Sequence, residues 1–434
     1  MIKSAAIVSL GCPKNTVDSE IMLHQLSKQY EITNDFHEAE ILVVNTCGFI
    51  KDAKEESINT ILDLASIKKQ GEQILIVTGC LSQRYSEELL QEIPEIDICM
   101  GVEQYLNVLP AIERAKKGER FTMCDRIKVA LHGKRKLITP KHTVYVKISE
   151  GCNNSCSFCI IPSIRGRYRS VAMEDILAET QSLVEQGAKE IIFVAEDTTR
   201  YGEDLYGKPR LAELLDKAAQ IPNLKMLRVL YCYPDTLTKE LIDIMASHSN
   251  ICKYLDIPLQ HADQDLLKSM NRKGTQEEFT DTILYAKSKG FIIRTTFIVG
   301  FPGETEAHFE NLVKFVQKMQ FDRLGVFTYS PEEGTRAAKM QNQIQEELKD
   351  QRKDIIMRLQ ADISFANNQK RVGEHCTVLV EGFENGLTIA RSYAEAPDVD
   401  GTILLPMAEN IKIGGLYPAE IMSADTYDLY AEWR

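Results

Sequence analysis

Apolar strands alternate with helical segments along most of the chain, and this alternation constrains the fold more than any other feature. In the first 125 residues the strands read AAIVSL, EILVVNT and QILIVTG, and a helical pattern follows each of them, beginning near Asp18, Lys51 and Ser82. Strands that alternate with helices predict βαβ units and a parallel sheet. We therefore expect an α/β domain over residues 1–125, with its functional residues just beyond the carboxyl ends of the strands.

Six further strand segments begin at residue 143, and they read VYVKIS, EIIFVAE, MLRVLY, YLDIPL, RTTFIVG and LGVFTYS. Amphipathic helices lie between them, and the segment EEFTDTILYAKSKG ends on Gly290 as expected of a helix C-cap. Six units are too few for a closed eight-unit barrel. The prediction for 143–340 is an open (βα)6 partial barrel, preceded by a basic linker or edge ribbon over 126–142.

The pattern changes again near the C-terminus. A charged helix is predicted over 341–368, and short strands such as CTVLVEGF, GLTIARS and GTILLP follow, separated by Gly, Asn and Pro turns. This pattern is typical of a small antiparallel β barrel, here over 369–434. The segment carries a net charge of −6, half of the −12 of the whole chain.

Composition excludes several classes of protein. No apolar run approaches the roughly 18 residues of a membrane span, and the N-terminus lacks the features of a signal peptide, so a cytoplasmic protein is expected. Eleven cysteines in such a protein indicate metal or redox chemistry rather than a disulfide framework. The acidic balance also disfavours a partner held mainly through phosphates.

The segment GCNNSCSFC places Cys152, Cys156 and Cys159 within eight residues at the end of the first barrel strand. A closed tetrahedral zinc site needs four ligands, so three thiolates leave such a site incomplete. Three thiolates can instead hold three corners of a four-iron, four-sulfur cluster and leave the fourth iron open. A zinc knuckle that takes a fourth ligand from elsewhere is the structural alternative.

Cys12, Cys47 and Cys80 form a second set of three, because each follows one of the N-terminal strands. The carboxyl ends of parallel strands meet at one edge of a sheet, so these cysteines are expected to converge. An inert buried cysteine is the ordinary interpretation of any one of them. Cys99, Cys124, Cys232, Cys252 and Cys376 share no spacing and are interpreted as structural or surface thiols.

The C-x3-C-x2-C spacing resembles the radical S-adenosylmethionine (SAM) superfamily. The resemblance implies that the open iron chelates the amino and carboxylate groups of SAM, and that an electron from the cluster breaks the sulfonium bond. By the same resemblance Phe158 would contact the adenine and Glu196 the methionyl amino group. The remaining cofactor-binding candidates are Gln260, together with Arg294 and Val299 on the strand before the GFPGE turn.

A purely structural interpretation of these SAM-binding candidates stays open. GFPGE is also compatible with a plain turn between strand and helix, and Asp256 or Gln260 with a satisfied strand end. His261 is interpreted as a hydrogen-bonded polar residue at the barrel rim rather than as a site residue.

Over its whole length the chain resembles the methylthiotransferases, which combine a three-cysteine N-terminal domain, a radical SAM barrel and a C-terminal TRAM domain. The resemblance implies an enzyme with two 4Fe-4S clusters, one radical SAM cluster and one auxiliary, in which all six cysteines are catalytic metal ligands. It further implies two SAM molecules per turnover and an electron donor such as flavodoxin or ferredoxin.

Two branches of that family differ in substrate. SLGCPKNTVDSE, FDRLGVFTYSPEEGT and ARSYAEAPDVDG resemble the branch that methylthiolates the β-carbon of an aspartate in small-subunit ribosomal protein twelve, on the ribosomal subunit. The acidic C-terminal segment agrees, because it suits a basic protein and repels a phosphate backbone. The arginine-rich GRYRS, 166–170, keeps methylthiolation of a tRNA adenosine as the alternative. An iron–sulfur electron carrier is disfavoured, because it has no need of an open iron on each cluster.

Overall fold

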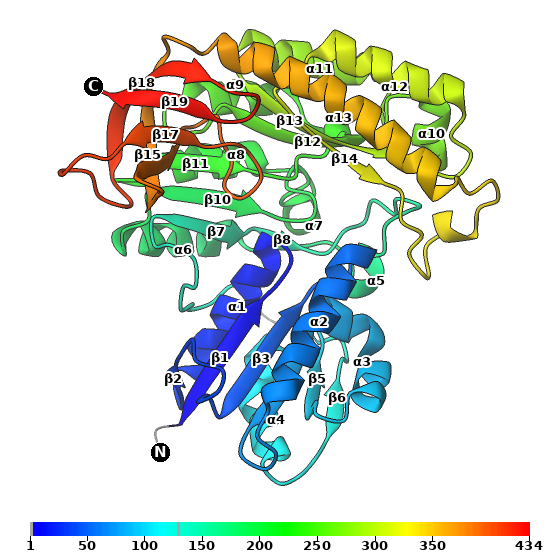
Figure 1. The fold of residues 1–434 in the computed structure, drawn as a ribbon, viewed down its shortest axis with the longest axis vertical. Coiled ribbons are helices and arrows are strands. Elements are labelled where there is room, and N and C mark those ends of the chain that lie inside the picture. The colour runs from blue at the N-terminus through cyan, green and yellow to red at the C-terminus, as the bar shows by residue number, and fades with distance from the viewer. Residues whose placement is uncertain (1–2, 128–130) are drawn as a thin grey trace.

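The N-terminal part of the computed structural model is a parallel sheet covered by helices on both faces (Figure 1). The structure describes residues 3–127 and 131–434. The sheet has the order β2-β1-β3-β4-β5-β6. Its strands are β1 Ser4–Ser9, β2 Glu31–Ile32, β3 Ile41–Thr46, β4 Ile74–Gly79, β5 Ile98–Met100 and β6 Phe121–Met123. The predicted parallel α/β domain is confirmed.

Four helices connect these strands, and their bounds are α1 Pro13–Leu26, α2 Lys51–Ile67, α3 Cys80–Glu92 and α4 Val108–Ala115. Apolar residues of α1 and α4 share one buried cluster, and those of α2 and α3 share another. α1 begins five residues before the predicted start at Asp18, because Pro13 occupies a first-turn position that suits its fixed φ and missing N–H. α3 likewise begins at Cys80 rather than Ser82.

Six parallel strands form the middle of the molecule as two three-stranded sheets, of order β11-β10-β7 and β12-β13-β14. They are β7 Thr143–Lys147, β10 Glu190–Val194, β11 Met226–Val229, β12 Tyr254–Gln260, β13 Ile292–Val299 and β14 Arg323–Thr328. A single parallel bridge, Leu227 to Ile251, connects the two sheets. This arrangement confirms the predicted open (βα)6 partial barrel.

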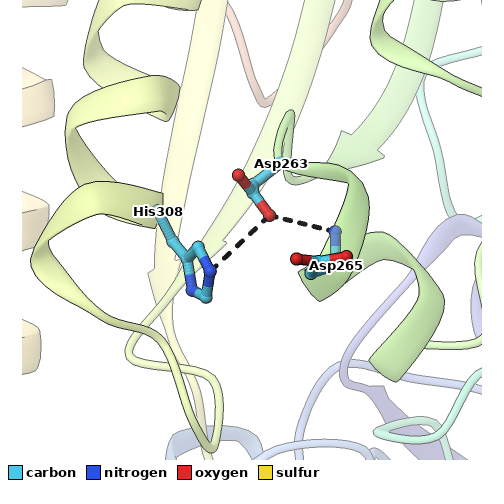
Figure 2. A group of neighbouring side chains, drawn as sticks. All are labelled: Asp263, Asp265 and His308. Atoms are coloured by element: carbon cyan, nitrogen blue, oxygen red, sulfur yellow. Dashed lines mark hydrogen bonds and ion pairs between the residues drawn. The ribbon is translucent and has the colours of Figure 1, made fainter.

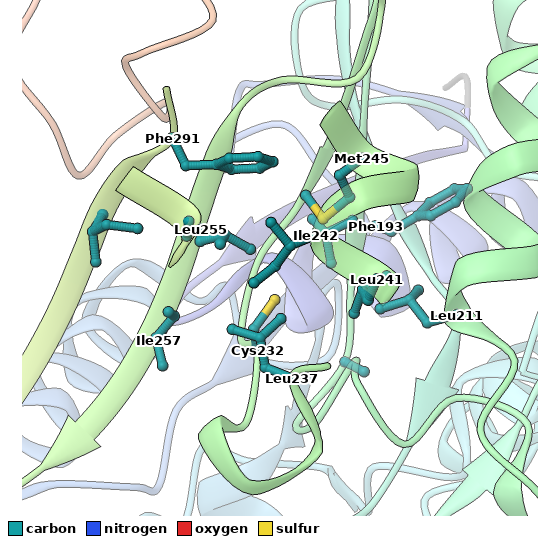
Figure 3. Packing of buried hydrophobic residues seen from close by; sticks show 14 of the residues in the cluster. Phe193, Leu211, Cys232, Leu237, Leu241, Ile242, Met245, Leu255, Ile257 and Phe291 are labelled. Atoms are coloured by element: carbon teal, nitrogen blue, oxygen red, sulfur yellow. The ribbon is translucent and has the colours of Figure 1, made fainter. Parts of the chain in front are cut away.

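Helices cover the outer face of the partial barrel, and a large apolar core fills the space between them and the strands (Figure 3). Ile242 and Met245 of α9 pack there against Leu255 of β12 and against Phe193 of β10. The covering helices are α6 Met173–Glu185, α8 Leu211–Ala219, α9 Lys239–Ser247, α11 Gln276–Ser288 and α12 Glu306–Met319. Three shorter helices lie between strand ends and these helices, and they are α5 Ile161–Arg165, which lies beside α3, α7 Glu203–Tyr206 and α10 Gln264–Ser269. Short 3-10 turns occupy Tyr105–Asn107, Pro234–Thr236 and Ala337–Lys339.

The helix α13, Glu346–Gln369, crosses the outside of β14 and leads into a closed five-stranded barrel (Figure 1). Its strands are β15 His375–Glu384, β16 Leu387–Arg391, β17 Ile403–Pro406, β18 Leu416–Ala424 and β19 Leu429–Trp433. All pairs are antiparallel except β17 with β19. The small β barrel that the sequence predicts is therefore confirmed, with one parallel pair.

The C-terminal segment closes the amino end of the partial barrel. Arg391 pairs at 2.7 Å with Glu190, the first residue of β10, and Arg228 pairs with the same carboxylate at 2.8 Å. Asp400 accepts a 2.6 Å hydrogen bond from the hydroxyl of Tyr254, the first residue of β12. The carboxyl end of the strands is left to face the N-terminal domain. Among the described residues no helix is long and apolar enough to cross a membrane.

Candidate functional site

The first cysteine set lies on one loop at the carboxyl end of the partial barrel. Two short antiparallel strands, β8 Ser149–Glu150 and β9 Arg169–Ser170, close the base of this loop. Gly151 has φ +77°, and a Cβ there would lie 2.5 Å from the Arg167 carbonyl oxygen, so glycine is needed for the close approach. The N–H of Cys152 donates to the Gly166 oxygen at 3.1 Å, and that of Cys159 to the Cys156 oxygen at 3.1 Å. Local bonds therefore close the loop, and the Ser157 N–H holds it to the barrel by donating to the Met270 oxygen at 2.9 Å.

Polar groups surround the thiols of this loop. The Cys156 sulfur lies 3.3 Å from the Tyr233 hydroxyl oxygen, and the Arg272 guanidinium donates to that sulfur at 3.8 Å. Burial, with the neighbouring Asp197 and Cys156 adding to it, raises the pKa of the Cys152 thiol to about 12. Burial also raises the pKa of Cys159. Metal binding at this loop must therefore release protons.

The spacing of the thiols disfavours a single zinc ion. Zinc binds thiolate at about 2.3 Å, so ligand sulfurs lie within about 4.6 Å of each other. Among residues 3–127 and 131–434, no three cysteine sulfurs lie within 4.8 Å of one another. Thiols that share a loop at wider spacing suit a multi-iron cluster, whose irons take one cysteine each.

In the described part of the chain, one group of potential metal ligands does have its ligand atoms within 4.8 Å of one another. It consists of Asp263, Asp265 and His308 (Figure 2). Asp263 caps α10, because its carboxylate accepts the Asp265 N–H at 3.0 Å. His308 belongs to the capping box of α12 and accepts the Thr305 N–H at 3.2 Å. Helix capping accounts for this group.

The second cysteine set lies at three strand ends of the N-terminal sheet, which the structure brings together as predicted. Cys12 follows β1, Cys47 follows β3, and Cys80 opens α3 directly after β4. A Cβ on Gly11, where φ is +86°, would lie 2.8 Å from the Cys47 Cβ. A Cβ on Gly48 would lie 2.8 Å from the Cys80 carbonyl carbon. Glycine therefore permits the close approach of the three loops.

Asn15 ties these loops together. Its side-chain amide donates to the Leu10 oxygen at 2.9 Å and to the Thr46 oxygen at 3.0 Å. Its Oδ1 accepts a 2.5 Å bond from Arg165, which lies beyond Cys159 in the chain. The pKa of the nearby Cys80 thiol is raised to about 12, because the effect of burial exceeds the lowering effect of the Arg165 charge.

A buried network of four charged residues joins the two cysteine sets. Lys147 and Arg165 are the cations, and Asp18 and Glu150 are the carboxylates. Lys147 lies 2.5 Å from Asp18 and 2.6 Å from Glu150, and Arg165 lies 3.2 Å from Asp18 and 2.6 Å from Glu150. Asp18 belongs to the N-terminal domain and the other three residues to the partial barrel. This network has no signal in the sequence, because Asp18 lies 129 residues before Lys147 and the four residues share no motif.

Glu196, the predicted contact for the methionyl amino group, is buried just after β10. Neither carboxylate oxygen has a hydrogen-bond partner among the described residues, and its one ion pair is a long 3.7 Å contact with the Arg165 Nε. Burial, with Glu150 adding to it, raises its pKa to about 7. A buried carboxylate without a close partner is costly, so the site suits an ammonium group supplied by a ligand.

The other predicted cofactor-binding residues have different surroundings. Phe158 packs in an apolar cluster that includes Ile298 of β13. Gln260, at the end of β12, has φ +75°, an uncommon backbone conformation for this residue type. The Arg294 guanidinium is bound to Asp256 at 2.7 Å, so its charge is already matched. The Val299 side chain is buried in the core. Their roles stay predictions.

A polar cavity of about 290 Å³ opens beside the first cysteine loop. Its lining includes Asn153, Asn154, Tyr168, Arg200, Tyr233 and Asn271. The Asn154 amide donates to Asp197 at 2.7 Å, and Arg200 donates to Asn154 Oδ1 at 3.2 Å. A polar ligand in this cavity would contact the cysteine loop directly.

His261 and Arg169 each lie against a glutamate of the protein. Buried His261 accepts the Asp263 N–H at 2.9 Å and lies 3.2 Å from Glu304, which confirms it as a satisfied polar residue. In the GRYRS segment Arg169 pairs with Glu103 at 2.5 Å, whereas Arg167 is exposed. One arginine of that segment is therefore committed to a contact within the protein.

Models of three protein families match the chain. The Radical SAM superfamily matches residues 146–316, the Uncharacterized protein family UPF0004 matches residues 4–101, and the TRAM domain matches residues 372–433. These ranges cover the partial barrel, the N-terminal sheet and the C-terminal barrel.

Solved structures share the fold at low sequence identity. TsrM from Kitasatospora setae, described as a radical S-adenosylmethionine methyltransferase with cobalamin and a 4Fe-4S cluster bound, has a TM-score of 0.56 and 12% identity. The match covers 95% of this chain and 84% of TsrM. OxsB, a cobalamin-dependent S-adenosylmethionine radical enzyme, has a TM-score of 0.54 and 14% identity over 82% of this chain and 56% of OxsB.

Curated relatives match over the full length. Proteins named ribosomal protein uS12 methylthiotransferase RimO are 46% identical in Thermoanaerobacter sp., covering all of both chains, and 48% identical in Desulforamulus reducens, covering 99% of each. A third, from Clostridioides difficile, is 45% identical and covers 98% of each chain. With the cysteine loop, the strand-end cysteines and the C-terminal barrel all in place, the chain belongs to the RimO family of radical SAM methylthiotransferases.

Proposed function

We propose that the protein converts a C–H bond on the β-carbon of an aspartate in ribosomal protein uS12 into C–S–CH3, using two SAM molecules per turnover. The observation that carries the proposal is the placement of two separate three-cysteine sets on either side of one domain junction. Full-length similarity to uS12 methylthiotransferases supports the same substrate. The acidic C-terminal barrel supports it too, because uS12 is expected to be basic.

The first set of thiols is assigned to the radical SAM cluster. Cys152, Cys156 and Cys159 would each hold one iron and leave the fourth open for SAM. When bound, such a cluster supplies the electron that cleaves the sulfonium bond of SAM. Glu196 is positioned to accept the methionyl ammonium, because its carboxylate is buried and lacks a close partner. Phe158 offers an apolar surface for the adenine.

The second set, Cys12, Cys47 and Cys80, is assigned to an auxiliary 4Fe-4S cluster. Its open iron would hold the sulfur that is methylated and then transferred. The chain holds this set against the first through Asn15 and Arg165, which bond across the junction.

We infer two protein partners from this function, the substrate and an electron donor. The natural substrate is uS12 on the small ribosomal subunit, which places the enzyme in the cytoplasm. Exposed Arg167, beside the cysteine loop, is available to meet ribosomal phosphates. An electron donor of the flavodoxin or ferredoxin class completes the reaction.

Mass spectrometry tests the proposal directly. Iron-reconstituted enzyme is incubated anaerobically with small ribosomal subunits, sulfide, reductant and SAM, and a parallel incubation contains tRNA. We expect one methylthio group on an aspartate of uS12 and none in the tRNA digest, with no product from a Cys156→Ala control. A methylthiolated adenosine with unmodified uS12 would replace this substrate by tRNA.

A further inference from the structure

Lys14 is a buried ammonium that the established motifs do not explain. It is the second residue of α1 and is only 8% exposed. Its Nζ donates one long bond, 3.4 Å, to the Ala195 carbonyl oxygen and lies 4.0 Å from the centre of the Tyr231 ring. Within the described residues it has no carboxylate partner within 4.0 Å. A lysine ammonium has three donors, so two stay available here.

The ammonium lies between the two cysteine sets. Cys12 is two residues before it in the chain, on the side of the second set. On the other side, Ala195 directly precedes Glu196 after β10, and Tyr231 follows β11, so both lie at the carboxyl end of the barrel strands. A substrate atom that must reach both cofactors therefore has to come near this ammonium.

Backbone hydrogen bonds hold Tyr231, whose ring lies beneath the Lys14 ammonium. Tyr231 has φ +64°, an uncommon conformation for an aromatic residue. Its N–H donates to Asp256 at 3.0 Å, and its carbonyl oxygen accepts the Thr198 N–H at 3.1 Å. Asp256 is itself held by Arg294 at 2.7 Å. Backbone conformations of this kind persist where the surroundings enforce them, and they cluster at ligand sites.

The charges around Lys14 leave room for an external anion. Cys12 and Tyr231 act on it electrostatically more than any carboxylate does. Glu196 is the carboxylate that acts on it, yet it lies beyond ion-pair distance and is assigned above to the amino group of SAM. Arg165 adds positive charge to the same region. The first turn of α1 contains no acidic residue, so the positive end of its dipole also favours an anion here.

We propose that Lys14 recognises the carboxylate of the substrate aspartate and so determines the choice of acceptor residue. This inference rests on the function proposed above and deepens it. In aspartate the β-carbon is bonded directly to the carboxylate carbon, so holding the carboxylate over Lys14 fixes the position of the reacting C–H bond. Asparagine has the same shape but no charge, so it cannot form the ion pair.

Two substrates that differ only in charge test this role. Peptides of the uS12 target segment carry either aspartate or asparagine at the modified position, and kcat/KM for methylthiolation is measured for both. We expect the native enzyme to prefer aspartate by about ten- to a hundred-fold, the range for a buried hydrogen bond to a charged group. In Lys14→Met the preference should fall to about one-fold, while iron content and 5′-deoxyadenosine release without peptide stay native.

Lys68→Met is the matched control. Lys68 is also a buried lysine, but Asp97 lies 2.6 Å from its ammonium and it is remote from both cysteine sets. Its loss should lower stability and leave the preference for aspartate at the native value. Lys14→Arg, which keeps the positive charge, should retain a preference for aspartate.

The possible outcomes separate the two claims. A Lys14→Met enzyme that still prefers aspartate by the native factor would overturn the role of Lys14 and leave the proposed function intact. A native enzyme that modifies neither peptide nor uS12 on the ribosome would overturn the proposed function itself. If Lys14→Met loses its iron, Lys14→Arg decides: a retained preference supports the inference, and a preference of about one-fold contradicts it.

Discussion

The two cysteine sets reach similar positions by different structural means. Cys152, Cys156 and Cys159 share one loop, whose base is closed by bonds within residues 149–170 and whose middle is held by distant segments, for example by Ser157, whose N–H donates to the Met270 oxygen at 2.9 Å. Cys12, Cys47 and Cys80 come from three strand ends, and their approach depends on the packing of the whole N-terminal sheet. The ligands of the first set are thus close together in the sequence, whereas those of the second set are brought together only by tertiary packing. The second should be the more sensitive to changes elsewhere in the fold.

The largest expected effect comes from removing single ligands. Cys156→Ala and Cys80→Ala should each abolish methylthiolation of uS12, measured by the mass of its target peptide. Each variant should lose about half of the roughly eight irons that two four-iron clusters contain. A Cys80→Ala protein with native iron content would show that Cys80 is not an auxiliary ligand.

Arg165→Met removes one cation of the buried network that joins the two cysteine sets. It leaves Asp18 and Glu150 buried with one cation fewer, which should lower the free energy of unfolding by about 3–5 kcal/mol. Chemical denaturation of the metal-free protein measures the loss. The matched control is Arg358→Met, because the exposed Arg358–Asp354 pair should contribute less than about 1 kcal/mol. Equal effects of the two variants would contradict a shared network.

Acid should loosen a contact remote from both sets. Glu395 is buried, which alone would raise its pKa, but Arg371 and Arg323 lower it to about 2. A carboxyl whose pKa is depressed in the folded state stabilises the protein above its unfolded pKa, near 4.5. Up to about 3 kcal/mol is then lost as the pH falls from 4.5 toward 2. Glu395→Gln should flatten that part of the pH–stability curve, and an unchanged slope would contradict the assignment.

Gly11→Ala tests whether the second set depends on close packing. The new methyl group would meet the Cys47 Cβ at 2.8 Å, and φ there is +86°. We expect a loss of about 1–3 kcal/mol and selective loss of the auxiliary iron, measured by iron analysis and unfolding. Gly71→Ala is the control, because φ is +76° but no atom lies within 4 Å. Its iron content should stay native, whereas parallel loss of iron in both variants would favour backbone strain alone.

The same difference explains what the sequence could predict. The first set is visible as a motif, because its ligands lie within eight residues. The second set required the alternation of strands and helices, from which the meeting of the three strand ends follows. The fold class was predictable for the same reason, since strand and helix periods are local properties.

Other features had no local signal. Asp18 joins the network of Lys147, Arg165 and Glu150 only when the two domains meet, and the four residues occur in ordinary strand and helix patterns. The contact of Tyr233 with Cys156 also joins distant segments. The early start of α1 did have a signal, because Pro13 at a first-turn position marks a helix N-terminus.

The central claim is that the two sets do different chemistry and that both are needed for the product. The most direct test quantifies two products in one anaerobic incubation of Cys80→Ala with SAM, reductant and ribosomal subunits. The account predicts 5′-deoxyadenosine at a level comparable to the native enzyme and no methylthio group on uS12. Absence of 5′-deoxyadenosine in a protein that keeps about four irons, or full methylthiolation of uS12, would contradict the separation of roles.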